Sequence, residues 1–172
     1  ESHVAGLMTG KAGILHLHLG DGQRGLQLVN AALDASEIPP RVFNPTHVNR
    51  RRALFEEAMP LADRGAWIDL TAFPVGPDED AWSAEDALLR YLGAGLPAER
   101  ITVSSDGGGC LPVFDADGRV TDMDVGSPGA LAAALRGLLD RARSAPLDGA
   151  PPIDAARAEQ LVDDVRSSRS AS

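Results

Sequence analysis

The stretch Gly13-Ile14-Leu15-His16-Leu17-His18 decides the fold, because it is the first of four short apolar runs that each end in polar residues. Each run has the length of a β-strand and is bounded by Gly, Pro or Asp, which favour turns. We therefore predict four strands. The other three runs are 42–47 (Val-Phe-Asn-Pro-Thr-His), 66–71 (Ala-Trp-Ile-Asp-Leu-Thr) and 101–105 (Ile-Thr-Val-Ser-Ser).

Helical patterns separate and follow these runs, with apolar residues at helical spacing in 25–35, 52–64, 83–92 and 128–143. Ser83 stands where a helix N-cap is expected. Strands that alternate with helices form βαβ units and a parallel sheet, with right-handed crossovers. The predicted fold class is α/β: a partial (β/α)8 TIM-type barrel of about four βα units.

The composition changes after residue 143, so we predict two parts. Residues 1–143 form the half barrel, and residues 144–172 form a Pro-containing linker, a short helix at about 154–165 and a frayed tail. The chain opens with Glu1-Ser2-His3, which is neither an initiator Met nor a signal peptide. We therefore expect that this numbering begins inside a longer protein.

The charge and cysteine content exclude several classes of protein. Sixteen Lys and Arg against 25 Asp and Glu give a net charge of −9, which argues against nucleic acid and against anionic membrane surfaces as partners. No apolar run approaches the ~20 residues that span a bilayer. Hydrophobic residues make up 44% of the chain, enough for a folded core. The single cysteine, Cys110, excludes an intrachain disulfide and favours a cytoplasmic location.

Candidate metal ligands stand at the ends of three predicted strands: His18, His47 and Asp106. In a βα barrel the carboxyl ends of the strands meet at one mouth. Two imidazoles and a carboxylate there suit zinc or a similar metal. Taken singly, each residue has an ordinary interpretation as a solvated histidine or a turn-forming Asp. His16 lies one layer deeper on the same face and is expected to be a buried, hydrogen-bonded histidine.

Three further features lie near the predicted mouth. Gly107-Gly108-Gly109 lacks the Lys and Ser/Thr of a phosphate-binding loop, so it indicates a close backbone approach or a positive φ. Arg50 follows His47 by three residues and is placed to bind a carboxylate with a forked pair of hydrogen bonds. The Arg50–Arg52 run can equally be solvated surface. Cys110 is interpreted as a small structural or substrate-lining residue.

Several strings together resemble isoaspartyl (β-aspartyl) dipeptidase of the amidohydrolase superfamily, from about residue 6 to residue 139. Pro45-Thr46-His47-Val48-Asn49-Arg50 is the most specific of them, and Ser104-Ser105-Asp106-Gly107 supports it. The others are Thr9-Gly10-Lys11-Ala12-Gly13, Leu17-His18-Leu19-Gly20-Asp21 and Leu54-Phe55-Glu56-Glu57-Ala58.

The resemblance implies a (β/α)8 barrel with two zinc ions that cleaves isoaspartyl dipeptides. His18 and His47 would hold the second metal, at the ends of the fifth and sixth barrel strands. Asp106 would contact a metal and the bridging hydroxide, take a proton during attack and deliver it to the leaving amine. Arg50 would hold a substrate carboxylate.

The family's His-x-His pair, its bridging carboxylated lysine and its small β-domain have no counterpart in this sequence, and Lys11 stands at the wrong end of a strand to replace the lysine. Gly108 and Cys110 stand where the family usually has Asn and Ser. We therefore expect the C-terminal half of a catalytic barrel that binds at most one zinc, is inactive alone, and self-associates or pairs with a missing N-terminal half.

Two alternatives stay open. One is a non-catalytic remnant or interaction module, and the other is an amidohydrolase that acts on cyclic amides or N-acyl amino acids.

Overall fold

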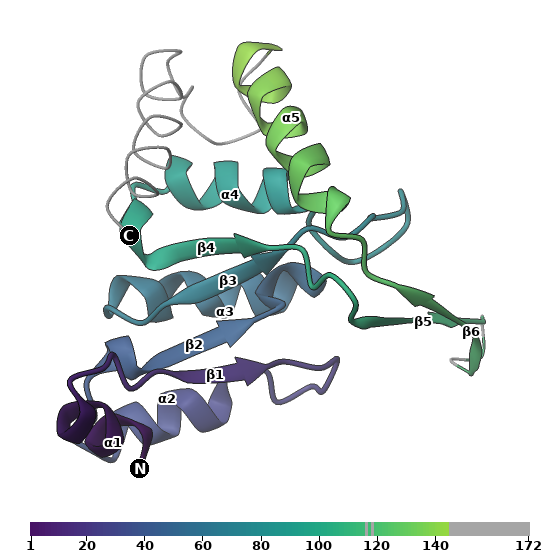
Figure 1. Cartoon of the computed structure of the whole chain (residues 1–172). Coiled ribbons are helices and arrows are strands. Elements are labelled where there is room, and N and C mark those ends of the chain that lie inside the picture. Colours follow the sequence, from purple (N-terminus) through teal and green to yellow (C-terminus); the bar gives the residue numbers. More distant parts are fainter. Residues whose placement is uncertain (116, 118, 145–172) are drawn as a thin grey trace.

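The computed structural model describes residues 1–115, 117 and 119–144, and its centre is a set of four short strands (Figure 1). β1 (Leu15–His18) pairs in parallel with β2 (Phe43–Thr46), and β3 (Ile68–Thr71) pairs in parallel with β4 (Ile101–Ser104). The Trp67 N–H donates to the Phe43 carbonyl at 3.0 Å, which links the two pairs. The four predicted strands are confirmed, each slightly shorter than the apolar run that predicts it.

A helix follows each of these strands, so the predicted alternation of strands and helices is also confirmed. α2 (Gln27–Asp34), α3 (Arg52–Asp63), α4 (Ala84–Gly93) and α5 (Gly129–Ser144) follow β1, β2, β3 and β4 in that order. Three short 3-10 helices, η1 (Pro40–Val42), η2 (Val48–Arg50) and η3 (Ala98–Arg100), flank the strands. Ser83 caps α4 as predicted, because its Oγ accepts the Asp86 N–H at 3.2 Å.

The hydrophobic core lies between the two inner strands and the helices. Every residue of β3 is buried, and Phe55, Leu61 and Tyr91 pack there with 0–1% exposure. β1 and β4 are the outer strands, and their residues are exposed or half-buried. Within the described residues the sheets are two-stranded and do not close, so a complete TIM barrel is not formed by this part of the chain.

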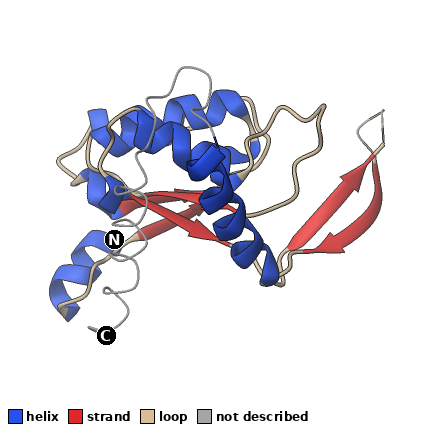
Figure 2. Cartoon of the chain, turned by 90° about the horizontal axis from the view of Figure 1, so that it is seen from above, coloured by secondary structure: helices blue, strands red, loops and turns tan. Residues whose placement is uncertain are grey.

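One helix and one two-stranded hairpin were not predicted from the sequence. α1 (Ser2–Thr9) precedes the first strand and ends at Gly10, whose φ of 66° is left-handed. β5 (Cys110–Phe114) and β6 (Val120–Val125) form an antiparallel hairpin that projects from the body of the molecule (Figure 2). All residues of β6 are exposed, so no buried face gives this hairpin an apolar pattern.

The predicted linker, short helix and tail beyond Ser144 lie outside the described residues. In the part of the chain that the structure describes, no helix has both the length and the hydrophobicity needed to cross a bilayer.

Candidate functional site

The candidate site lies at the carboxyl ends of the four central strands. β1 ends with His18, His47 directly follows β2, β3 ends with Thr71, and Asp106 follows β4 by two residues. Parallel strands present their carboxyl ends at the same edge, which is where the loops that bind ligands in α/β folds are found.

The three predicted metal ligands come together at this edge. His18 Nδ1 lies 3.0 Å from His47 Nε2, and their ring centroids are 5.0 Å apart. Asp106 Oδ2 lies 4.0 Å from the same His47 Nε2. The side chains of His47 and Asp106 are 12% and 31% exposed, so a small ligand can reach the cluster from solvent.

The chemistry of this donor set fits zinc. Two nitrogens that bind one tetrahedral zinc at ~2.0–2.1 Å are themselves about 3.3 Å apart, close to the observed His18–His47 separation. Asp106 stands farther out, and among the described residues no three His, Cys, Asp or Glu side chains are gathered into a metal-holding group. The Asp106 carboxylate therefore has to move inward to complete a three-ligand set.

His47 adopts an unusual backbone conformation, and its ring lies between His18 at the end of β1 and Thr71 at the end of β3. Its φ of 64° is left-handed, and it begins the turn that continues into η2. His47 Nδ1 lies 2.7 Å from Thr71 Oγ1. Burial lowers the pKa of His47 below its usual value; nearby Asp106 opposes this shift, and nearby His18 adds to it. The neutral ring is the form that binds metal ions.

Asp106 is held by the glycine run that follows it. Its own φ is 46°, and its carbonyl accepts the Gly109 N–H at 2.8 Å. Gly108 has a φ of 88°, which confirms that the run supplies a positive φ. A Cβ on Gly109 would lie 2.6 Å from Asp106 Oδ2, so the close approach at this glycine is made by the Asp106 side chain.

Arg50 lies beside the histidines but already has partners. Its Nε and Nη2 donate to the two carboxylate oxygens of Asp21 at 2.8 and 3.1 Å, and its Nη1 donates to the Leu19 carbonyl at 2.8 Å. These contacts use three of the five guanidinium N–H groups. Cys110 opens β5 and is an exposed free thiol.

The expected burial of His16 is wrong. His16 is exposed, and its ring meets that of His18 edge-on at 4.9 Å between centroids. The physical reason is the position of β1 at the outer edge of the strands, where nothing in the described residues covers it.

A buried polar network that was not predicted from the sequence lies beneath the site. Asp69 on β3 is 4% exposed, and its carboxylate accepts hydroxyl hydrogen bonds from Thr46, Thr102 and Ser104 at 2.5, 2.6 and 2.7 Å. These bonds join β3 to its neighbours β2 and β4. A charged residue inside an otherwise apolar run was the signal that indicates such a network.

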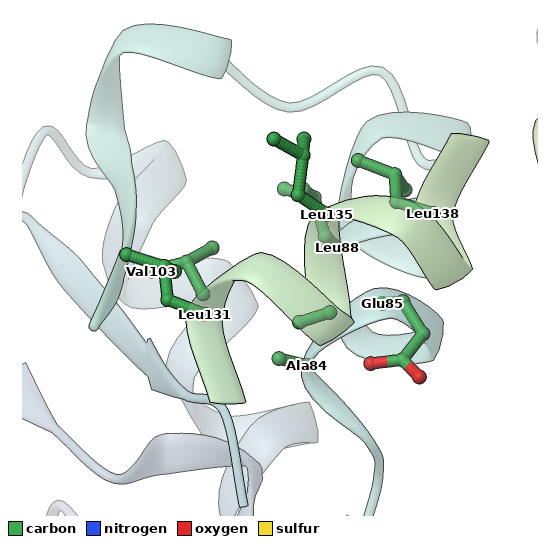
Figure 3. Close-up of a pocket in the computed structure, with 8 residues that line it drawn as sticks. Ala84, Glu85, Leu88, Val103, Leu131, Leu135 and Leu138 are labelled. Atoms are coloured by element: carbon green, nitrogen blue, oxygen red, sulfur yellow. The ribbon is translucent and has the colours of Figure 1, made fainter. Parts of the chain in front are cut away.

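A separate cavity of about 80 Å³ lies between α4, α5 and β4 (Figure 3). Its lining is apolar except for Glu85 and contains none of the candidate site residues. The candidate site at the strand ends is therefore separate from this cavity.

No protein-family model matches the chain. It is similar to a solved structure of β-aspartyl dipeptidase from the thermophilic, keratin-degrading Fervidobacterium islandicum AW-1 in complex with β-Asp-Leu dipeptide. The two share 36% sequence identity with a TM-score of 0.72, over 92% of this chain and 40% of that one.

A second structure of β-aspartyl dipeptidase from the same organism matches at 32% identity with a TM-score of 0.66, over 93% of this chain and 38% of that one. The chain thus spans about two-fifths of the length of the structures that it matches. Over nearly its whole length it is similar to one part of the β-aspartyl dipeptidases, which confirms the resemblance found in the sequence.

Proposed function

We propose that this chain is the metal-holding part of a zinc-dependent hydrolase that cleaves β-aspartyl dipeptides. The observation that carries the proposal is the meeting of His18 Nδ1, His47 Nε2 and Asp106 Oδ2 at one edge of the strands. In this proposal residues 1–143 are half of a (β/α)8 barrel, and the matched dipeptidases support that assignment.

His18 and His47 are the zinc ligands in this proposal. They would hold the ion, and the chemistry it would supply there is a more acidic water molecule and a polarised scissile carbonyl. Asp106 takes the proton of the attacking water and delivers it to the leaving amine, which makes it the general base and then the general acid. The 4.0 Å distance between its carboxylate and His47 Nε2 supports this role.

In this proposal Arg50 binds a substrate carboxylate, and Cys110 is a further substrate-binding residue. Asp21 and the Leu19 carbonyl hold the guanidinium in one orientation, and two of its N–H groups stay available for a ligand. A guanidinium group that is already held in place loses less conformational entropy when it binds a carboxylate than a mobile guanidinium group does.

The rest of the barrel is the partner that the proposed enzyme needs. β1 and β4 are outer strands without a further neighbour among the described residues, and Leu15 on β1 is 38% exposed. Unpaired parallel strands are normally covered on both sides. We propose that another part of a longer protein, a separate chain or a second copy covers them, in the cytoplasm.

The test is a chimera in which this chain replaces the matching two-fifths of the Fervidobacterium islandicum dipeptidase. We expect the chimera to hydrolyse β-Asp-Leu with zinc present, and the 172-residue chain alone to be inactive. Asp106→Asn in the chimera should lower kcat by about 10²-fold or more, the usual contribution of general acid–base catalysis. Arg136→Gln, distant in sequence from every site residue, serves as the surface control.

Each outcome of this test separates the proposal from an alternative. A folded chimera that binds zinc without hydrolysing any β-aspartyl dipeptide would contradict the proposed substrate. Activity on cyclic amides or N-acyl amino acids instead would point to a different amidohydrolase, and absence of zinc binding would favour a non-catalytic module.

A further inference from the structure

We infer that Thr71 is a positioning residue for the metal centre: its hydroxyl accepts the Nδ1 proton of His47 and thereby leaves the His47 Nε2 lone pair free. This inference deepens the proposed function and rests on it for its biological meaning. The bond between His47 and Thr71 can nevertheless be tested on the metal-free chain.

The two nitrogens of His47 face different surroundings. Nε2 faces His18 Nδ1 at 3.0 Å and Asp106 Oδ2 at 4.0 Å, and Nδ1 faces Thr71 Oγ1 at 2.7 Å. A neutral imidazole carries one proton, and the hydrogen bonds around the ring decide which nitrogen holds it. With the proton on Nδ1, the Thr71 oxygen is its acceptor, and Nε2 points into the candidate metal site as a lone pair.

The backbone around Thr71 is fastened to the turn that carries His47. Asn49, which is fully buried and lies two residues after His47, accepts the Thr71 N–H at 2.8 Å and donates to the Thr71 carbonyl at 3.0 Å. Its amide also donates to the Trp82 carbonyl at 2.8 Å. Both backbone groups of Thr71 are therefore bound by the segment whose histidine its side chain contacts.

The side chain of Thr71 has little freedom of its own. Thr71 is 2% exposed, and a β-branched residue in a strand has few accessible χ1 rotamers. The hydroxyl oxygen is thus fixed at the point where the His47 Nδ1 proton needs an acceptor. Outer hydrogen bonds of this kind fix the tautomer and ring orientation of metal-binding histidines and are worth about 10–100-fold in metal affinity.

Removing the hydroxyl should move the proton. In Thr71→Val the Nδ1 proton of His47 loses its acceptor, whereas a proton on His47 Nε2 has an acceptor in His18 Nδ1 once His18 carries its own proton on Nε2. We therefore expect His47 in this variant to shift to the Nε2–H tautomer. His47 Nε2 then carries a proton in place of the lone pair that zinc requires. Zinc binding must therefore be accompanied by a return of this proton to Nδ1, which lowers the zinc affinity.

The experiment compares four forms of the 172-residue chain: wild type, Thr71→Val, Thr71→Ser and Thr102→Val. Imidazole nitrogen NMR on the metal-free chain reports the tautomer of His47, and single replacements at His3, His16 and His18 assign the signals of the four histidines by elimination. Zinc competition with a chelator then reports affinity. Thr102 is the control, because it is a threonine of the neighbouring strand β4 whose hydroxyl binds Asp69 at 2.6 Å, with no recorded contact with His47 among the described residues.

We expect the Nδ1–H tautomer in wild type, Thr71→Ser and Thr102→Val, and the Nε2–H tautomer in Thr71→Val. Zinc affinity should fall about 10–100-fold in Thr71→Val alone and recover in Thr71→Ser. An Nε2–H tautomer in wild type, an unchanged tautomer in Thr71→Val, or an equal loss in Thr102→Val would overturn the inference. If the wild-type chain binds no zinc, the proposed function fails. The NMR measurement of the His47 tautomer still tests whether Thr71 accepts the Nδ1 proton.

Discussion

Replacing Gly109 by alanine should disturb the candidate site without unfolding the protein. A Cβ at this position would lie 2.6 Å from Oδ2, 2.7 Å from Cγ and 2.8 Å from Oδ1 of Asp106. Ordinary contacts between such atoms begin near ~3.5 Å, so the carboxylate must shift by about 0.9 Å or change its rotamer. The atoms that move are the end of one side chain, and the backbone need not move with them.

Two opposing effects on the free energy of unfolding nearly cancel in Gly109→Ala. An off-rotamer side chain costs about 0.5–1.5 kcal/mol. Loss of glycine's freedom in the unfolded chain contributes about 0.4–1 kcal/mol in the opposite direction. The free energy of unfolding should thus change by less than about 1 kcal/mol. Zinc affinity should fall at least tenfold, because Asp106 no longer reaches the position from which it completes the ligand set.

Gly108→Ala is the matched control one residue away. Nothing lies within 4 Å of a Cβ on Gly108, but its φ of 88° strains any other residue. This variant should lose about 1–2 kcal/mol of stability and keep its zinc affinity. Urea unfolding and chelator competition on both variants provide the assay. Equal zinc affinity in Gly109→Ala and wild type, with both folded, would refute the placement of Asp106 in the site.

Three further outcomes are expected. Arg50→Lys in the active chimera should raise KM for β-aspartyl dipeptides with little change in kcat, because a point charge replaces a fork; a fall in kcat alone would contradict a binding role. Asp69→Asn should lower the free energy of unfolding by at least about 1.5 kcal/mol in urea, because an amide cannot accept all three hydroxyl bonds. Burial raises the pKa of Tyr91 to about 12, so its contribution to stability is complete below about pH 10 and is lost as pH rises from 10 to 12. Phenolate absorbance measures this titration directly because Tyr91 is the single tyrosine, and an ordinary pKa near 10 would contradict its burial.

The parts of the fold that were predictable from the sequence are those that bury apolar surface. The runs 42–47 and 66–71 became β2 and β3, because a strand in the interior must be apolar on the faces it buries. The β5–β6 hairpin was not predictable by the same argument, because every residue of β6 is exposed and Asp122 and Asp124 interrupt any apolar run there. α1 was missed although it carries several apolar residues, and Val4, Leu7 and Met8 on it are exposed.

The candidate site was predictable as far as strand order determines it. His18, His47 and Asp106 follow from the rule that parallel strands end at one edge. The role of Thr71 was not predictable in this way. Threonine is common in strands because its β-branched side chain packs well there, so its presence alone indicates no function. Its contact with His47 depends on the left-handed turn at that histidine. The pairing of Arg50 with Asp21 likewise depends on how the loop after β1 folds back, which no local pattern indicates.

Anomalous diffraction at the zinc edge, from crystals of the chain grown with zinc, tests the central claim most directly. The account predicts one zinc ion bound to His18 Nδ1 and His47 Nε2 at ~2.0–2.1 Å, with Asp106 drawn in from its present position. Zinc bound at other residues, or no zinc between the two histidines at saturating concentration, would contradict it.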